Sequence, residues 1–261
     1  MTTLSAERLT IGYEERTIVQ DLDLDFIPGQ ITAIIGPNGC GKSTILKTMA
    51  RLHTATSGSI YLDGKMIHQT PAKEVAKKLA ILPQAPEAPD GLTVYELISY
   101  GRTPHQSGFS LLKKHDREMI EWAMNVTGLT DLQNQAVDTL SGGQRQRAWI
   151  AMSIAQETDL LMLDEPTTYL DLAHQLEVLQ LLERINQEDG RTIIMVIHDL
   201  NQASRFAHQL VALKNGKIVK QGSAEQVMDP VVLKQVFNID TEIVADPRTG
   251  KPAMISYDLI K

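Results

Sequence analysis

The segment Gly36–Ser43 carries the pattern G-x-x-x-x-G-K-S, which is suited to holding the phosphates of a nucleotide. Its glycines let a row of backbone N–H groups approach phosphate oxygens, and a helix that begins at Ser43 adds partial positive charge. Lys42 is expected to reach the β- and γ-phosphates, Ser43 to place its hydroxyl on Mg²⁺, and Thr44 to bond the α-phosphate. A chance match is disfavoured because a buried strand precedes the loop and a helix follows it. The predicted nucleotide-binding residues are Gly36, Pro37, Asn38, Gly39, Cys40, Gly41, Lys42, Ser43 and Thr44.

Two consecutive carboxylates, Asp164 and Glu165, follow the apolar run Leu160–Leu163. At the carboxyl end of a strand such a pair suits a magnesium site, with Asp164 binding the metal through water and Glu165 polarising the attacking water. Taken alone the pair is a weak signal, because acidic residues after a strand are also common in turns and helix caps. The phosphate loop that precedes it favours the catalytic interpretation.

A third motif, Leu140–Gln144, reads L-S-G-G-Q and opens a helical stretch. Free backbone amides at the start of a helix, together with the Ser141 hydroxyl, could grip a second face of a phosphate. The motif therefore adds a second candidate phosphate contact to the chain.

Cys40, the only cysteine, lies inside the phosphate loop. Converging amides, a helix N-terminus and Lys42 would favour the thiolate, which makes Cys40 a candidate reactive residue. The alternative is a small side chain that is turned into the protein and is inert. The sequence leaves both interpretations open.

Alternating strands and helices must position these motifs. Short apolar runs predict strands at 31–35, 79–82, 160–163 and 192–197, with further strands at 22–27 and 60–62 and a terminal hairpin around 246–250. Helical periodicity is found at 43–51, 94–100, 115–126 and 144–155, and the proline-rich stretch 83–89 indicates a hinge. The pattern and the phosphate loop predict an α/β P-loop fold with a parallel core and an inserted helical lobe.

Composition limits the function classes. The 261 residues can bury a full core, and 32 acidic against 25 basic residues give a net charge of −7, with no chain-wide basic footprint for nucleic acid. The lone cysteine fits a reducing cytoplasm, and the N-terminus lacks a secretory signal pattern. The apolar runs are far shorter than the roughly 18 to 20 residues of a membrane helix, so any membrane role is expected to go through partners.

The chain resembles the ATP-binding cassette (ABC) family along nearly its whole length. Seven features carry the resemblance in the family's order: Tyr13, the loop Gly36–Thr44, Gln84, the L-S-G-G-Q signature, the pair Asp164 and Glu165, Leu170 with Asp171, and His198. The resemblance implies a RecA-like P-loop NTPase core with an N-terminal antiparallel β subdomain and an inserted α-helical subdomain. It also implies ATP and Mg²⁺ as cofactors, with catalytic roles for Glu165, His198, Gln84 and Lys42 and metal contacts from Ser43, Gln84 and Asp164. Tyr13 would stack on adenine, and the other histidines, among them His53, His68 and His174, are interpreted as structural.

The resemblance also implies a head-to-tail homodimer with two ATP molecules at its interface. Each ATP would be clamped by the phosphate loop of one copy and by Ser141, Gly142, Gly143, Gln144 and Asp171 of the other. Within the single ABC ATPase domain, the expected parts are a nucleotide-binding core at 1–84 and 157–235, a helical subdomain at 85–156 and a C-terminal tail at 236–261.

The stretch Tyr100–His105 and the segment 224–237 are most similar to ATPases of iron-siderophore, haem and cobalamin importers. This similarity implies integral-membrane permease subunits, an extracytoplasmic solute-binding protein as an indirect partner, no nucleic acid, and a peripheral position on the cytoplasmic face of the membrane. The function it implies is that of an ATP-binding and hydrolysing motor subunit of an ABC importer for iron-siderophore or a related metal chelate. Because an ATPase does not touch the cargo, the substrate follows from resemblance alone. A motor for lipid or efflux transport and a soluble non-transport ABC ATPase remain alternatives.

Overall fold

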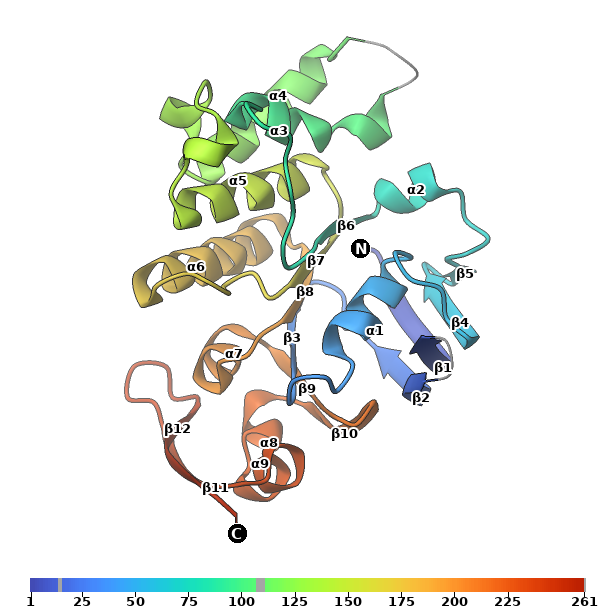
Figure 1. Ribbon diagram of the computed structural model, residues 1–261, viewed down its shortest axis with the longest axis vertical. Helices are drawn as coiled ribbons and strands as arrows, with labels where there is room; N and C mark the ends of the chain where they lie inside the picture. The colour runs from blue at the N-terminus through green and yellow to red at the C-terminus, as the bar shows by residue number, and fades with distance from the viewer. Residues whose placement is uncertain (14–15, 107–110, 261) are drawn as a thin grey trace. The chain divides into compact units, whose positions relative to one another are not determined.

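The computed structural model describes residues 1–13, 16–106 and 111–260 (Figure 1). The chain divides into two compact units, residues 1–69 with 192–261, and residues 70–191. The functional division into core, helical subdomain and tail stays a prediction, since its boundaries were set by motifs and not by compactness. No helix in the described part of the chain is both long enough and apolar enough to cross a membrane.

The first unit is built around the strand β3, Ile31–Ile35, all five residues of which are buried. It pairs in parallel with β8 (Thr192–Val196) on one side and β9 (Gln209–Lys214) on the other, and β10 (Lys217–Gly222) adds an antiparallel edge. An apolar strand without alternation is typical of a parallel sheet that is covered on both faces. The predicted strand at 31–35 is confirmed, and β8 ends one residue before the predicted boundary.

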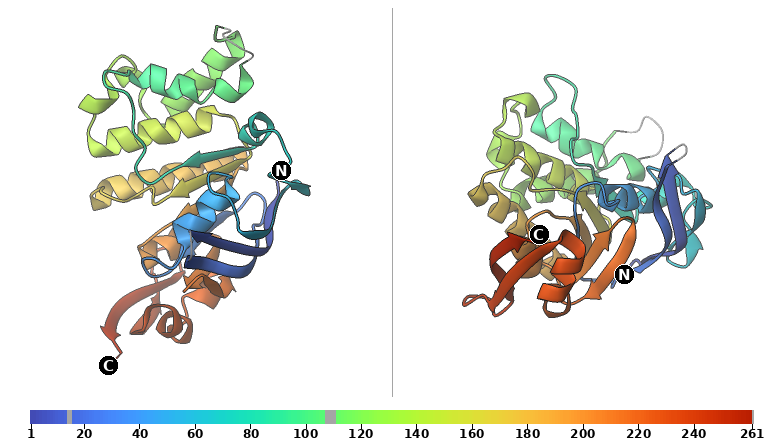
Figure 2. Two further views of the ribbon diagram at one scale, coloured as in Figure 1. Left: turned by 45° about the vertical axis from the view of Figure 1, so that its right-hand side comes forward. Right: turned by 60° about the horizontal axis from the view of Figure 1, so that its bottom comes forward.

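An antiparallel sheet in the order β2-β1-β4-β5 forms the N-terminal layer of this unit, as predicted (Figure 2). Its strands are β1 (Leu4–Tyr13), β2 (Arg16–Asp25), β4 (Ser57–Leu62) and β5 (Lys65–Met66). The strand predicted at 22–27 is the second half of β2, which starts at Arg16. Its apolar alternation is visible only after Asp21, because Asp21 has a φ of 52° and the register of β1 with β2 is irregular here.

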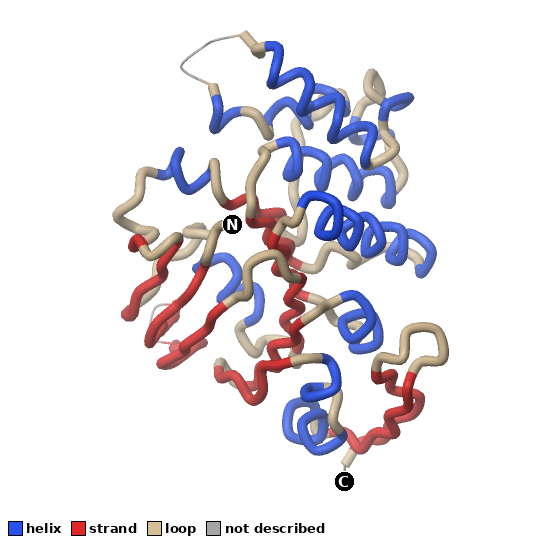
Figure 3. Tube along the Cα trace, turned by 180° about the vertical axis from the view of Figure 1, so that it is seen from behind, coloured by secondary structure: helices blue, strands red, loops and turns tan. Residues whose placement is uncertain are grey.

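The C-terminal hairpin predicted around 246–250 is confirmed as β11 (Ile239–Ala245) and β12 (Pro252–Leu259), preceded by α8 (Ala224–Val227) and α9 (Pro230–Phe237). It lies beside α7, Leu200–Phe206, as Figure 3 shows. The Asn201 side chain accepts from the N–H of Met254 at 2.8 Å and donates to its carbonyl at 3.0 Å. The Lys251 ammonium donates to two carbonyls at the end of α7, which is where a cation is favourable.

The second unit holds the parallel pair β6 (Leu79–Leu82) and β7 (Leu160–Asp164). Its helices are α2 (Ala72–Ala76), α3 (Val94–Tyr100), α4 (Lys114–Val126), α5 (Gly142–Ala155) and α6 (Leu172–Asp189). Helices α3, α4 and α5 pack on one another, which agrees with the predicted helical subdomain. Three of the helices bear out the sequence prediction to within two residues, and no helix or strand occurs between β6 and α3, where a hinge was predicted.

A buried arginine holds these helices together. The Arg102 side chain is 1% exposed and pairs with Asp116 of α4 at 3.0 Å and with Glu157 at 3.0 Å. It also donates to the carbonyl of Ala155 at the end of α5, at 2.7 Å. Burying a guanidinium is costly unless it is paired and hydrogen-bonded, and these partners meet that condition.

Candidate nucleotide site

The phosphate loop connects β3 to α1, Lys42–Met49. Gly36 has a φ of 153°, and a Cβ on it would lie 2.3 Å from the Leu213 carbonyl oxygen and 2.8 Å from the Cys40 sulfur. Gly39 and Gly41 have φ values of 74° and 107°, which L-residues with side chains rarely adopt. Backbone geometry therefore favours glycine at all three positions, and at Gly36 there is also no space for a side chain.

Lys42 is 5% exposed, and its ammonium donates to the carbonyls of Gly36 at 2.8 Å and Pro37 at 3.0 Å. The positive charge of Lys42 therefore lies on the inner side of the loop, next to the start of α1. Asn38 and Gly39 at the loop tip are exposed, while Ser43 and Thr44 are half-buried in the first turn of α1. The loop, the N-terminus of α1 and the Lys42 ammonium together form a site suited to an anion.

The structure favours the buried, inert interpretation of Cys40 over the reactive one. The residue is 4% exposed, and burial raises the pKa of its thiol even though the Lys42 charge and backbone N–H groups act in the opposite direction. Of the two interpretations left open by the sequence, the structure therefore favours the neutral thiol. Desolvation outweighs the nearby positive charge because the sulfur points into the protein beneath Gly36.

His198 lies in the same unit, two residues after β8. Because β8 and β3 are parallel neighbours, His198 and the phosphate loop both leave from carboxyl ends of adjacent strands; the Ile197 N–H still bonds the Ile34 carbonyl at 3.2 Å. His198 is exposed. Strand ends of this kind are where α/β proteins place their ligand sites.

In the second unit, Gln84 and Glu165 meet. They follow the parallel strands β6 and β7, and the Gln84 amide donates to Glu165 Oε2 at 2.5 Å. Glu165 has a φ of 55°, an uncommon backbone conformation for this residue type, and Asp164 beside it is 1% exposed. The hydroxyl of Thr168 also donates to Glu165 Oε2, at 3.0 Å. One carboxylate oxygen, Oε2, therefore accepts from two neutral donors, Gln84 and Thr168.

The signature residues start α5. Ser141 is the N-cap: its hydroxyl accepts from the Gln144 N–H at 3.3 Å, and the Gln144 side chain accepts from the Ser141 N–H at 3.0 Å. This reciprocal capping box fixes the first turn. Ser141 and Gly142 are exposed, and Gly143 is buried.

Asp171 is the N-cap of α6, and its Oδ1 accepts from the His174 N–H at 2.9 Å. This backbone hydrogen bond is the main cause of a lowered pKa of the Asp171 carboxyl, and the hydrogen bond from the His174 ring lowers the pKa further. The carboxyl is therefore ionised at neutral pH. Asp171 is exposed, so its charge is available to a partner at this end of α6.

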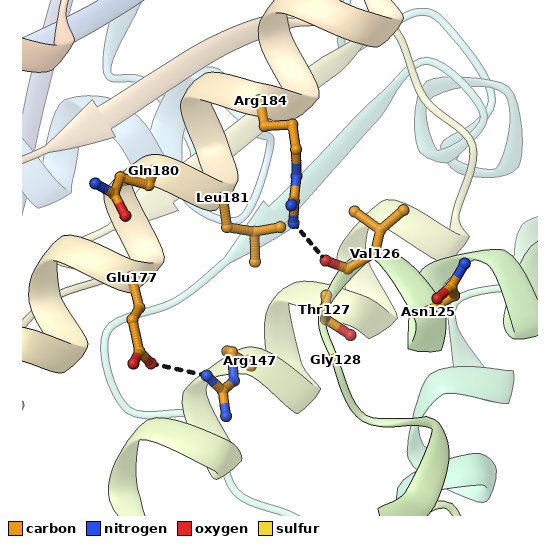
Figure 4. A pocket seen from close by; sticks show the side chains of 9 residues that line it. All are labelled: Asn125, Val126, Thr127, Gly128, Arg147, Glu177, Gln180, Leu181 and Arg184. Atoms are coloured by element: carbon orange, nitrogen blue, oxygen red, sulfur yellow. Dashed lines mark hydrogen bonds and ion pairs between the residues drawn. The ribbon is translucent and has the colours of Figure 1, made fainter.

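Helices α5 and α6 are also joined further along. Arg147 of α5 donates to Glu177 of α6 at 2.8 Å, and the two side chains point toward each other at the edge of a cavity of about 330 Å³ (Figure 4). On the other side of the cavity, Arg184 donates to the Val126 carbonyl at the end of α4, at 2.7 Å. The helix that starts with the signature is thus tied to the helix that starts with Asp171.

The predicted site residues form three groups. One holds Gly36–Thr44 and His198 in the first unit. In the second unit, Gln84 lies with Asp164 and Glu165, and the signature lies with Asp171. Tyr13 is the last residue of β1, and its side chain lies outside the described residues. The contacts that Thr168 makes with Glu165 and that His174 makes with Asp171, each three residues apart, were not predicted from the sequence.

A glycine cradle between a buried strand and a helix, with a strand-end carboxylate pair, defines a P-loop nucleotide-binding α/β protein. The chain belongs to the ABC transporter family, whose model matches residues 19–168. It is 61% identical over 261 residues to the iron(3+)-hydroxamate import ATP-binding protein FhuC of Bacillus subtilis (strain 168), covering 100% of this chain and 97% of that protein. It is 47% identical over 252 residues to the ferric enterobactin transport ATP-binding protein FepC of Escherichia coli (strain K12), covering 97% and 93%.

Solved structures agree with this assignment. A metal-chelate type ABC transporter in an inward-facing conformation matches with a TM-score of 0.84 and 30% identity, over 97% of this chain and 96% of that one. A dimeric ATP-binding cassette in a post-hydrolysis state, bound to ADP and phosphate, matches with a TM-score of 0.74 and 27% identity, over 84% and 98%. The predicted fold class is confirmed, and the chain is an ATP-binding ABC ATPase.

Proposed function

We propose that this chain is the motor subunit of an importer for iron chelated by siderophores. The siderophore class that we propose is the hydroxamates. The observation that carries the proposal is 61% identity, over the whole chain, to an iron(3+)-hydroxamate import ATP-binding protein. The cargo does not pass through an ATPase, so the proposal rests on relatedness for the substrate and on the site residues for the chemistry.

In this function the loop Gly36–Thr44 binds the phosphates of ATP. Lys42 exchanges its bonds to the Gly36 and Pro37 carbonyls for bonds to the β- and γ-phosphates, a short movement of a group that is already in the cradle. Thr44 bonds the α-phosphate, and Tyr13 stacks on the adenine ring.

Ser43, Gln84 and Asp164 hold Mg²⁺ in this proposal. A hydroxyl, an amide oxygen and a carboxylate are the hard oxygen donors that Mg²⁺ prefers, so these three side chains would fit the ion. When bound, the ion neutralises charge on the β- and γ-phosphates. No group of three or more His, Cys, Asp or Glu side chains suited to a metal occurs in the described ranges, and a Mg-ATP site of this type requires only one carboxylate.

Glu165 acts as the general base. It accepts a proton from the water that attacks the γ-phosphate, while the bonds that Gln84 and Thr168 donate to its Oε2 orient the carboxylate. His198 donates to the γ-phosphate and steadies the water. Lys42 stabilises the charge that develops on the phosphate oxygens.

Two copies associate head to tail around two ATP molecules. Each ATP is bound by Gly36–Thr44 of one copy and by Ser141–Gln144 and Asp171 of the other, so a single copy has only half-sites. Binding closes the dimer, and hydrolysis removes the γ-phosphate contacts that hold it closed. Integral-membrane permease subunits receive this motion, an extracytoplasmic solute-binding protein delivers the chelate, and the chain lies at the cytoplasmic face of the membrane. Nucleic acid has no part in the cycle.

Uptake of labelled iron tests the substrate. In cells that lack this gene, uptake of a ferric hydroxamate should be lost and should return with the wild-type chain. A matched Lys42→Ala chain, expressed to the same level, should not restore it. Uptake of a ferric catecholate is measured in the same strains as the comparison. Unchanged hydroxamate uptake in the deleted strain, with loss of catecholate uptake, would overturn the hydroxamate assignment.

A further inference from the structure

The imidazole of His174 lies directly on the signature. His174 is in the first turn of α6, and a Cβ on Gly143 would stand 2.3 Å from its Cδ2 and 2.9 Å from its Cγ. No side chain fits at Gly143 while the ring stays in place. The ring therefore sets the position of the buried signature glycine relative to α6.

The same ring is bonded to Asp171. Its Nδ1 lies 2.8 Å from Asp171 Oδ1, the oxygen that also accepts the His174 backbone N–H at 2.9 Å. Because the Asp171 carboxylate is ionised and accepts, Nδ1 carries the hydrogen in this bond. One residue thus touches the signature with its carbon edge and holds Asp171 with its nitrogen.

Helix capping alone does not account for this arrangement. The backbone N–H at position 174 caps α6 whatever the side chain is, and an ion pair between side chains 38% and 67% exposed adds little stability. The pair Arg147 and Glu177 already joins α5 to α6 one turn further on (Figure 4). What the His174 ring adds is a direct link between two short segments at the helix starts.

We propose that His174 is a positioning residue that makes the signature and Asp171 move as one body. The inference rests on the proposed function, in which both segments meet the ATP bound by the second copy. When the signature closes on that ATP, the Asp171 carboxylate moves with it. Closure of one nucleotide site is therefore coupled to the partner copy. Without the ring, the signature and Asp171 reach the ATP independently, and closure of the dimer becomes less favourable.

Two substitutions separate the two contacts. His174→Asn keeps an N–H donor close to the position of Nδ1 but removes the ring from Gly143. His174→Phe keeps the ring on Gly143 but removes the donor to Asp171. His174→Ala removes both, and Glu188→Ala, at an exposed position on the same helix, is the matched control. All four retain the backbone N–H that caps α6, and thermal unfolding verifies that each folds.

The experiment uses these variants in a Glu165→Gln background, in which ATP is bound but turnover is slow. Mg-ATP binding to the monomer is measured at low protein concentration, and the ATP-dependent monomer–dimer equilibrium by analytical ultracentrifugation. We expect unchanged ATP affinity of the monomer and a dimer dissociation constant raised at least about tenfold in His174→Ala, with smaller increases in His174→Asn and His174→Phe. Without the Glu165→Gln change, the Hill coefficient for ATP hydrolysis should fall in the same order.

Two failures are distinguishable. If the Glu165→Gln parent binds no ATP or forms no ATP-dependent dimer, the proposed function fails. If the parent dimerises and His174→Ala dimerises with the same dissociation constant and the same Hill coefficient, the positioning role of His174 is overturned.

Discussion

The Gln84 amide donates a 2.5 Å hydrogen bond to Oε2 of Glu165, across the parallel strands β6 and β7. Gln84 stands at the start of the irregular segment that leads to α3, and Glu165 is the proposed base. A displacement of that segment would therefore move a bond to the proposed base. In the proposed function, this bond is a direct route by which the permease changes the rate of hydrolysis.

Gln84→Ala tests this route. ATP affinity should stay near the wild-type value, because the phosphates are held by the loop at Gly36–Thr44, while stimulation of hydrolysis by a cargo-loaded permease should be lost or strongly reduced. Steady-state hydrolysis in proteoliposomes, with and without loaded binding protein, measures the stimulation. Equal stimulation of wild type and variant would mean that Gln84 does not couple the two.

Cys40 should resist thiol reagents in the folded protein. Burial raises the pKa of its thiol and covers the sulfur, and both effects slow alkylation. Mass spectrometry should show labelling many-fold slower than in the denatured chain, and Cys40→Ser should retain hydrolysis. Rapid labelling of the native protein would contradict the buried orientation.

Buried strands and capped helices were predictable from sequence because their signals are local. The strand β3 is a short, mainly apolar run, and α3 follows the N-cap Thr93, which forms a capping box with Glu96 three residues later. The first part of β2 was not predictable, because Asp21 interrupts its alternation at an irregular point of the pairing. The strand β1 and the β9–β10 hairpin were also missed.

In the site, too, local signals were predictable from the sequence and contacts between distant segments were not. The resemblance to the ABC family implied that Gln84, Glu165 and Lys42 serve one chemistry, but no local pattern indicates that His174 contacts Gly143, 31 positions away in the chain. The burial of Cys40 was undecided in the sequence for the same reason. Charge near the thiol is visible in the motif, whereas desolvation depends on how the loop folds over Leu213.

Arg102 should be a large contributor to stability. Its side chain is 1% exposed and its partner Asp116 6%, and removal of one member of such a buried pair costs about 3–5 kcal/mol. Arg102→Ala should lower the free energy of unfolding by that order in urea titrations. The matched control is Arg147→Ala, whose partly exposed pair with Glu177 is worth about 0–1 kcal/mol. Similar losses in both variants would contradict the assigned role of burial.

Acid should weaken this pair in a defined direction. Burial alone would raise the pKa of Asp116, but the Lys113 N–H and the Arg102 guanidinium outweigh it and lower the pKa. A lowered folded-state pKa gives stability that is present above the ordinary Asp value of about 3.9 and is lost as the pH falls through the folded-state value. The stability difference between wild type and Asp116→Asn should therefore shrink from pH 7 towards pH 3. A difference that is constant or grows on acidification would refute the ionised pair.

The most direct test of the account is the turnover of Glu165→Gln. This variant keeps the shape and a hydrogen-bonding group but cannot accept the proton of the attacking water. Its steady-state rate of Mg-ATP hydrolysis should fall by roughly 10²- to 10⁴-fold, the usual contribution of a general base, while Mg-ATP binding is retained. Hydrolysis at the wild-type rate by a correctly folded Glu165→Gln protein would contradict the proposed mechanism.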